Sequence, residues 1–314
     1  MNKLLLAALV SSVISIPAFA ADYTIMAPAA PGGGWDQTAR TMQEALQAEG
    51  ISGNVQVTNV PGAGGTIGIA QFVNQENGNP NALIVGGYVM VGAILTNASP
   101  VTLAEVTPIA RLTGEAVGIV VPANSDIADM DGLVAKLKEN TGAVSWAGGS
   151  AGGADHITAG LIAKAVGVDP TQVNYIAYSG GGEALAAILG GQVTVGVSGI
   201  SEFASQIEAG ELRLLAVSTD TRVPGFDAPT LQEAGVDTAV QNWRMVAAAP
   251  GLSDEQVSAI NADIEAMVNS ETWKAALESR GWVDTYLAGD AFETQLAADI
   301  AATEAILKDI GLVE

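Results

Sequence analysis

The chain has 314 residues, enough for two domains of ordinary size, and 49% of them are apolar. It carries 34 Asp and Glu against 12 Lys and Arg, a formal net charge of −22, which excludes nucleic acid and anionic membrane surfaces as natural partners. Cysteine is absent and histidine occurs once, which excludes disulfides, thiolate metal sites, cysteine nucleophiles and imidazole-rich metal sites.

The first 20 residues have the pattern of a secretory signal peptide. Lys3 supplies the positive charge, residues 4–16 are apolar, and Ala18-Phe19-Ala20 forms a small-x-small cleavage site. The apolar stretch is shorter than the ~20 residues that span a membrane, so an anchor is the weaker interpretation. We therefore expect cleavage after Ala20 and a mature periplasmic protein.

From residue 23 onward, short β-like runs alternate with segments of helical period. The predicted strands cover residues 23–27, 54–58, 82–86, 117–121, 143–147, 173–177, 193–197, 213–218 and 245–249. The predicted helices cover residues 36–49 (with Asp36 as N-cap), 66–74, 130–139, 155–166, 183–189, 254–268, 272–278 and 291–307. This alternation indicates an α/β fold with largely parallel sheets.

The strand–loop–helix units fall into two series, which predict two lobes. The series meet around residues 121–125. We expect the second lobe to hold residues 122–219. The first lobe is then discontinuous and holds residues 21–121 together with residues 220–314, because the C-terminal helices pack back onto it.

Glycines gather in four loops, each between a predicted strand and a predicted helix. The loops contain Gly32-Gly33-Gly34, Gly62-Ala63-Gly64-Gly65, Gly148 to Gly153, and Gly180-Gly181-Gly182. Such loops line the crevice at the carboxyl ends of parallel strands, where helix N-termini offer free N–H groups to anions. Tight turns alone would also explain a single cluster, but the four together predict one cleft lined with amide donors.

A catalytic alternative rests on residues 148–152, which match the G-x-S-x-G nucleophile elbow of α/β-hydrolases. That fold needs a histidine late in the chain, whereas the single histidine, His156, follows Ser150 by six residues. We therefore expect no enzyme, and keep an exported serine hydrolase that uses Ser150 as the alternative. The chain has no Walker A motif, no complete G-x-G-x-x-G and no EF-hand loop, so we expect neither a cofactor nor a metal.

A series of motifs resembles the receptors of tripartite tricarboxylate transporters, the TctC or Bug family. The motifs are Ala30 to Arg40, Asn59 to Gly65, Gly148-Gly149-Ser150 leading to His156, Tyr178 to Ala184, Gly190 to Val193, and Asn242-Trp243-Arg244 ahead of residues 249–253. The last of these motifs resembles the tricarboxylate-receptor branch of the family. The resemblance covers residues 23–314 in the family's order. It implies a two-lobed periplasmic-binding-protein-like (Venus flytrap) fold that closes on a small carboxylate and delivers it to a two-subunit membrane permease, and we expect a monomer.

The resemblance also implies a set of ligand-binding residues. In these receptors, backbone amides and ordered waters of two first-lobe loops hold one ligand carboxylate. The implied positions are Gly33, Gly34, Trp35, Asp36, Ala63, Gly64 and Gly65 in the first lobe, and Ser150, Ala151, His156, Tyr178 and Gly180 in the second, with Pro31, Tyr88, Ser198 and Arg244 completing the predicted site.

Two charged members of this set need separate roles. We expect Asp36 to cap a helix or hold a water, because its carboxylate would repel an anionic ligand. Arg244 lies between Trp243 and an apolar run, so we expect its guanidinium to bind a ligand carboxylate through two parallel (bidentate) hydrogen bonds. A structural salt bridge is the alternative. The clamp favours a highly charged ligand such as citrate. A signalling receptor that uses the same cleft is a third interpretation.

Overall fold

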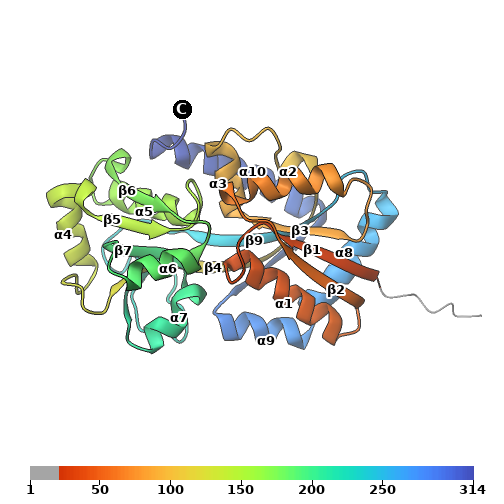
Figure 1. The fold of residues 1–314 in the computed structure, drawn as a ribbon, viewed down its shortest axis with the longest axis horizontal. Coiled ribbons are helices and arrows are strands. Elements are labelled where there is room, and N and C mark those ends of the chain that lie inside the picture. The colour runs from red at the N-terminus through yellow and green to blue at the C-terminus, as the bar shows by residue number, and fades with distance from the viewer. Residues whose placement is uncertain (1–20) are drawn as a thin grey trace, which may run out of the picture.

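The computed structural model describes residues 21–314, so the predicted signal peptide and its cleavage site lie outside the described chain. A ten-stranded sheet runs through the molecule in the order β2-β1-β3-β9-β4-β7-β5-β6, with β8 and β10 also paired to β4. Helices cover both faces, and the elements separate into two halves along the long axis (Figure 1).

The first half is built around three parallel strands. These are β1 (Ala21–Ala27), β2 (Ser52–Asn59) and β3 (Ala82–Gly87), with β1 in the middle. The helices between and after them are α1 (Gly34–Ala48), α2 (Thr66–Gln75) and α3 (Tyr88–Thr96). All six residues of β3 are buried, as expected for a strand covered on both faces.

The second half repeats this arrangement with a second parallel triplet. β5 (Ser145–Gly148) lies between β6 (Asn174–Ala177) and β7 (Val195–Gly199). Its helices are α4 (Met130–Asn140), α5 (Ala154–Ala165), α6 (Gly181–Leu189) and α7 (Ile200–Glu208). The prediction of parallel strands therefore applies to the triplet at the centre of each half.

Antiparallel strands join the two halves. The 16-residue strand β4 (Thr107–Pro122) pairs through residues 107–116 with β9 (Gln241–Ala248), and through its last residues with β7 and β8 (Leu212–Val217). The partners of β4 change between Ala116 and Val117. This shared strand makes the fold two-lobed, and we call the halves the first and second lobes. The predicted boundaries at residues 121–122 and 219–220 stay a prediction.

The C-terminal elements pack on the first-lobe part of the sheet. They are α8 (Asp254–Asn269), α9 (Glu271–Arg280), β10 (Val283–Ala288) and α10 (Gly289–Asp309). Helix α8 begins with a capping box in which Ser253 and Gln256 bond each other's backbone N–H groups. Helix α10 contacts α3 and β4, and α9 contacts α1.

Four features were not predicted from the sequence. Strands β3 and β7 end at Gly87 and Gly199, and helices α3 and α7 begin at the next residue, so no separate turn lies between strand and helix. The antiparallel strand β10 was also missed, and β4 starts ten residues before the predicted position. The other predicted elements are present within a few residues of the expected bounds.

Candidate ligand-binding cleft

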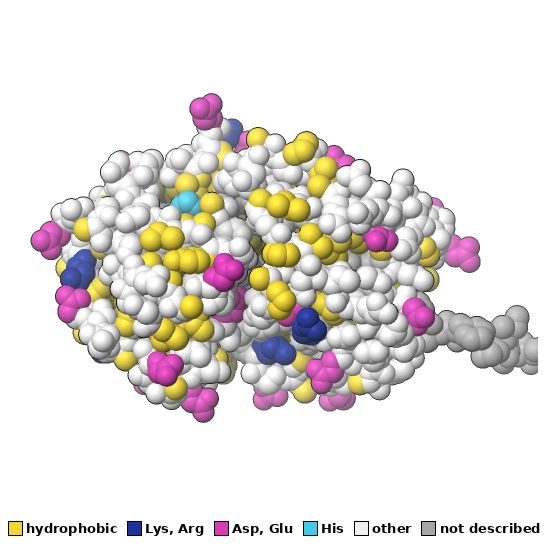
Figure 2. Space-filling view, viewed as in Figure 1, with side chains coloured by type: hydrophobic (Ala, Val, Ile, Leu, Met, Phe, Trp, Pro, Cys, Tyr) yellow, Lys and Arg dark blue, Asp and Glu magenta, His cyan; other side chains and the backbone are white. Residues whose placement is uncertain are grey.

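A narrow cavity of about 70 Å³ lies where the glycine-rich loops of the two lobes meet. We call it the interlobe cleft. Figure 2 shows the groove between the two halves of the molecule, with acidic side chains along it. Half of the predicted site residues line the cleft: Gly33, Gly34, Trp35, Gly64, Ser150, Gly180, Ser198 and Arg244. Residues from all four glycine-rich loops therefore converge on one space.

The other eight predicted residues do not line the cleft. These are Pro31, Asp36, Ala63, Gly65, Tyr88, Ala151, His156 and Tyr178. Pro31, Ala63 and Ala151 are exposed at the surface. Tyr88 is buried, with its ring centroid 6.3 Å from that of Trp243. Gly65 lies under Trp35, where a Cβ would come within 2.9 Å of the indole, so its role is to let that ring pack closely.

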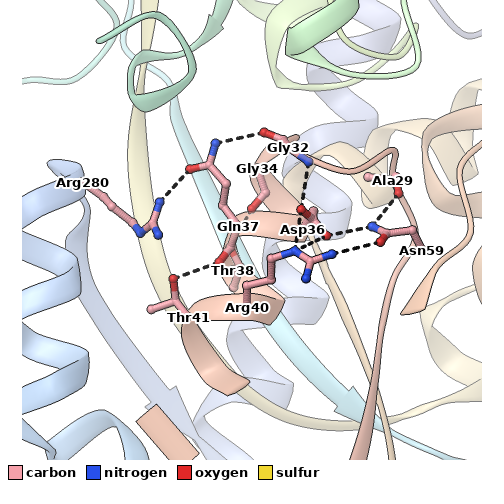
Figure 3. Close-up of polar contacts among 10 residues, drawn as sticks. All are labelled: Ala29, Gly32, Gly34, Asp36, Gln37, Thr38, Arg40, Thr41, Asn59 and Arg280. Atoms are coloured by element: carbon pink, nitrogen blue, oxygen red, sulfur yellow. Dashed lines mark hydrogen bonds and ion pairs between the residues drawn. The ribbon is translucent and has the colours of Figure 1, made fainter. Parts of the chain in front are cut away.

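Asp36 organises the first loop. The expectation that it is the N-cap is wrong: α1 begins at Gly34, with Gly33 as a cap that has no side chain. The Asp36 carboxylate instead accepts the Gly32 N–H at 2.8 Å and the Asn59 amide at 2.9 Å, and it pairs with Arg40 at 3.0 Å (Figure 3). Asp36 thus ties the first loop to the end of β2.

These contacts keep Asp36 ionised although it is buried. Burial tends to raise the pKa of Asp36, but the hydrogen bonds from Arg40, Gly32 and Asn59 outweigh it and leave the pKa below its ordinary value. The carboxylate is saturated by partners of its own lobe. Asp36 therefore shapes the loop that carries Gly33 and Gly34 and does not face the ligand space.

The N-terminus of α1 opens into the cleft and meets a side chain from the other lobe. The Gly34 N–H donates to Oε1 of Glu202 at 3.1 Å, although the two residues are 168 positions apart. A Cβ on Gly34 would lie 3.0 Å from the Cζ of Arg244 and 3.2 Å from Oε1 of Glu202. Glycine at position 34 therefore makes room for charged groups of two other elements.

Loops of the two lobes also touch directly on the other side of the cleft. Gly64 has a φ of +61°, and a Cβ there would meet Ala93 and would lie 3.2 Å from the Cβ of Ser150. A side chain at position 64 would thus be strained and would separate the lobes. This close approach places the second glycine-rich loop against the third.

Arg244 of β9 lines the cleft and forms a buried ion pair. Its Nη2 donates to Oε2 of Glu115, and the two side chains are 1% and 0% exposed. The guanidinium also lies over the ring of Trp282, with Cζ 4.9 Å from the centroid. Its Nη1 has no hydrogen-bond partner among the described residues. The structural salt bridge named as an alternative is thus present, and the N–H groups of Nη1 are left unpaired.

Two further carboxylates line the cleft beside this pair. Oε2 of Glu202 accepts a hydrogen bond from the Ser198 hydroxyl at 3.3 Å, and Oδ2 of Asp155 accepts one from the Gly149 N–H at 2.8 Å. Burial raises the pKa of Glu202 to about 8, with a further contribution from the charges of Glu115 and Asp155. Burial likewise raises the pKa of Asp155 to about 7, against the Gly149 hydrogen bond. Both groups bind protons more tightly than exposed carboxyls do.

Sequence analysis missed these acidic residues. Glu202 lies in the first turn of α7, a helix that was not predicted. Asp155 was visible as the first residue of a predicted helix, and an acidic residue in a first turn is ordinary. Asn242 was quoted only as part of a family motif, yet its side chain lines the cleft and its Oδ1 has no partner among the described residues.

His156 does not form a catalytic pair with Ser150. Its Nδ1 accepts the Gly152 N–H at 3.2 Å, and its ring stacks on Tyr175 with centroids 4.1 Å apart. Burial lowers the pKa of His156 to about 4, so the ring is neutral at physiological pH. No hydrogen bond joins His156 to Ser150 in the described part of the chain. The ring supports the third loop and offers no base to a nucleophile.

A larger cavity of about 550 Å³ lies elsewhere, beside the strands that connect the lobes. Ala116 of β4, Gln241 of β9, Leu277 of α9 and Trp282 line it, and no predicted site residue does. Among residues 21–314, no group of three or more His, Asp or Glu is placed to hold a metal ion. The interlobe cleft is therefore the candidate ligand site.

The fold and the cleft define a two-lobed receptor of the periplasmic-binding-protein class. The family model described as "Tripartite tricarboxylate transporter family receptor" matches residues 38–312. The chain belongs to this family, whose members are periplasmic solute-binding receptors and not enzymes. Over residues 21–314, the helices all fall short of the length or apolar character required to cross a bilayer.

Individual relatives agree with this assignment. Protein BugT of Bordetella pertussis is 25% identical over 292 residues, which cover 91% of this chain and 88% of BugT. The solved structure of the periplasmic binding protein BugD superposes with a TM-score of 0.84 at 22% identity, covering 93% of this chain and 98% of BugD. MatC of Rhodopseudomonas palustris, solved with bound malate, superposes with a TM-score of 0.77 at 23% identity, covering 93% of this chain and 100% of MatC.

Proposed function

We propose that this chain captures a small carboxylate in the interlobe cleft and delivers it to a two-subunit permease of the membrane. The single observation that carries the proposal is the convergence of four glycine-rich loops and Arg244 on one cavity between the lobes. Backbone N–H groups at helix N-termini and an unpaired guanidinium donor are suited to oxyanions. The malate in the solved structure of MatC belongs to the same ligand class.

Of the ligands expected from the sequence, the cleft favours a dicarboxylate over citrate. The cavity is small, and Asp155 and Glu202 stand beside the ion pair of Glu115 and Arg244. A ligand with a third carboxylate is bulkier than a dicarboxylate and fits a cavity of about 70 Å³ less well. Arg244 has one unpaired terminal nitrogen, Nη1, because Nη2 donates to Glu115. The bidentate hydrogen bond expected from the sequence is therefore replaced by contact through Nη1.

Calorimetry of the mature chain with succinate, malate and citrate tests the binding part of the proposal. We expect saturable binding of a dicarboxylate, with citrate weaker. Saturating ligand at 100 times its dissociation constant should raise the free energy of unfolding by about 2.7 kcal/mol. Absence of binding by every carboxylate tested would show that the cleft has another class of ligand.

Delivery and export need separate experiments. Uptake of the bound carboxylate into vesicles that contain the permease should require the receptor, and equal uptake without it would contradict delivery. Export predicts a mature N-terminus at Ala21, which N-terminal sequencing of the secreted protein measures. A mature chain that starts elsewhere would move the cleavage site.

A further inference from the structure

The larger cavity of about 550 Å³ lies where the chain passes between the lobes, and we call it the hinge cavity. Part of its wall is formed by the connecting strands. Ala116 is the residue at which β4 changes partners, and residues 239–241 lead into β9. Small-molecule sites typically have volumes of about 300–1,000 Å³. The hinge cavity is within this range and is far larger than the interlobe cleft of about 70 Å³.

The two opposite connections of the hinge cavity belong to different lobes. Val223 lines it and packs in one apolar cluster with Val217 of β8, a second-lobe strand. Leu277 of α9 and Trp282 line it from the first lobe. A Cβ on Gly281 would lie 3.4 Å from the side chain of Val223, so these walls approach each other closely at one edge. A molecule bound in the hinge cavity would therefore touch elements of both lobes.

The lining is suited to a largely apolar molecule. Val223, Leu277 and Trp282 are buried apolar side chains of the wall. Val283 at the rim is 48% exposed, and it is one of four large hydrophobic side chains that are exposed in residues 21–314. Covering this surface with an apolar molecule releases the water in contact with it, which favours binding.

The charged groups at the rim argue against an anion. Asp220 and Glu278 contribute negative charge, and both are exposed. Arg222 is the one cationic residue of the described lining, and it already pairs with Glu233 at 2.8 Å. A carboxylate here would meet two acids and no free base. Exposed acids also attract a cation only weakly, so an uncharged molecule fits best.

The wall also holds N–H donors that have no acceptor. Oε1 of Gln241 accepts a hydrogen bond from Arg111 at 3.2 Å, which leaves Nε2 of Gln241 as a donor without a partner in residues 21–314. Trp282 is 5% exposed, and its Nε1 likewise has no partner among the described residues. Buried donors are normally paired in native proteins. A carbonyl or hydroxyl oxygen on the bound molecule would supply an acceptor.

We propose that the hinge cavity is a second binding site, for an uncharged and largely apolar molecule with a carbonyl or hydroxyl oxygen, and that its occupancy strengthens ligand binding in the interlobe cleft. The site itself is independent of the proposed function. The coupling rests on the proposed function, because it requires a carboxylate in the cleft.

Trp282 connects the hinge cavity with the interlobe cleft. It lines the cavity, and the Cζ of Arg244, a residue of the cleft, lies 4.9 Å from the centroid of its ring. In the same arrangement the lobes touch, because the Gly34 N–H donates to Glu202. A molecule that fits the hinge cavity here stabilises the lobes in contact. By linkage, the molecule and the cleft ligand should each tighten the binding of the other.

Three probes of similar size and different charge test the site: 2-acetylnaphthalene, 2-naphthoate and 2-naphthylmethylammonium. Ligand-observed NMR titrations of the mature chain measure their affinities without any carboxylate for the cleft. We expect saturable binding of 2-acetylnaphthalene, at least tenfold tighter than that of either charged probe. No binding of the neutral probe, or equal or tighter binding of a charged one, would overturn the proposal.

Variants locate the bound probe. Val283→Trp fills the rim and should weaken the binding of 2-acetylnaphthalene at least tenfold, whereas Leu189→Trp, at a 43% exposed position on α6, should leave it unchanged. Gln241→Leu removes the free donor and should weaken binding about fivefold, which provides a second variant if circular dichroism shows that Val283→Trp does not fold. Unchanged affinity in the folded variants would show that the probe binds elsewhere and refute the site. A dimer in sedimentation that Val283→Trp abolishes would show that a second copy covers the rim, and would also refute it.

Calorimetry tests the coupling. The affinity for the carboxylate that binds the cleft is measured with and without saturating 2-acetylnaphthalene, and we expect it to be at least fivefold tighter with the probe. Unchanged or weaker affinity would overturn the coupling. If no carboxylate binds under either condition, the proposed function fails and the coupling fails with it, while the site is still decided by the probe titration.

Discussion

Breaking the buried ion pair of Glu115 and Arg244 should strongly destabilise the protein. Arg244→Met removes the guanidinium but keeps much of its aliphatic volume, and it leaves the Glu115 carboxylate fully buried with the Ser201 N–H as its hydrogen-bond donor. Removing one partner of a buried pair typically costs about 3–5 kcal/mol. The lost contact with Trp282 adds about 0.5–2 kcal/mol.

The double variant Glu115→Gln/Arg244→Met isolates the charge effect. It removes both charges, and the Gln side chain can still accept the Ser201 N–H, so most of the lost stability should return. We expect the double variant to lie within about 2 kcal/mol of the parent and to be more stable than Arg244→Met. Urea unfolding of the mature chain, followed by circular dichroism and tryptophan fluorescence, measures these free energies.

An exposed ion pair supplies the control. Lys136→Met removes the partner of Asp126 at the surface and should change stability by no more than about 1 kcal/mol. If Arg244→Met costs no more than this control, the pair is not the desolvated unit inferred from its burial. The same variant tests the ligand contact, because unchanged affinity for the bound carboxylate would contradict a role for Arg244 in binding.

Three other perturbations probe the cleft and its supporting loop. Gly34→Ala should destabilise the protein by about 1–3 kcal/mol and weaken ligand binding, because the added methyl overlaps the cleft charges, whereas Gly182→Ala in open space should be neutral or stabilising. The pKa of Glu202 rises from 4.5 to about 8 on folding, so the folded state binds a proton that the unfolded state has lost. The free energy of unfolding should therefore fall as pH rises through this window, by up to about 1.4 kcal/mol per pH unit. Thermal melts measure this pH profile, and Glu202→Gln should flatten it. Asp36→Ala should cost about 2–3 kcal/mol because the Gly32 N–H, the Asn59 amide and Arg40 lose their shared acceptor, whereas Arg40→Ala at the exposed end should cost at most about 1 kcal/mol.

Each of these expectations has a contradicting outcome. Equal unfolding midpoints for the two alanine variants would show that the cleft accommodates a methyl group on α1. A fall in stability with pH between 4.5 and 8 that is equally steep in the parent and in the Gln variant would assign the titration to other groups. Equal losses for the Asp36 and Arg40 variants would mean that the ion pair, and not the backbone hydrogen bonds, holds the loop.

Local sequence patterns were sufficient for most strands and helices. The buried strand β3 was predicted over residues 82–86 because these residues form an unbroken apolar run that ends at glycine. The four glycine-rich loops were found because each glycine cluster lies directly between a strand pattern and a helix pattern in the local sequence. Half of the site residues predicted from the family resemblance line the cleft, including Gly34 and Arg244.

Only the tertiary structure decided what the charged residues do. The sequence by itself determined that Arg244 lies in an apolar strand, but the strand's position beside β4 brings it to Glu115, 129 residues away. Glu202 accepts the Gly34 N–H, 168 residues away in the sequence, because the two lobes meet at the cleft. Hydrophobic periodicity reflects residues that are close together in the sequence, so it predicts local helices and strands. The partner of a buried charge depends instead on strand order and on the contact of the two lobes. The acidic character of the cleft therefore emerged from the fold.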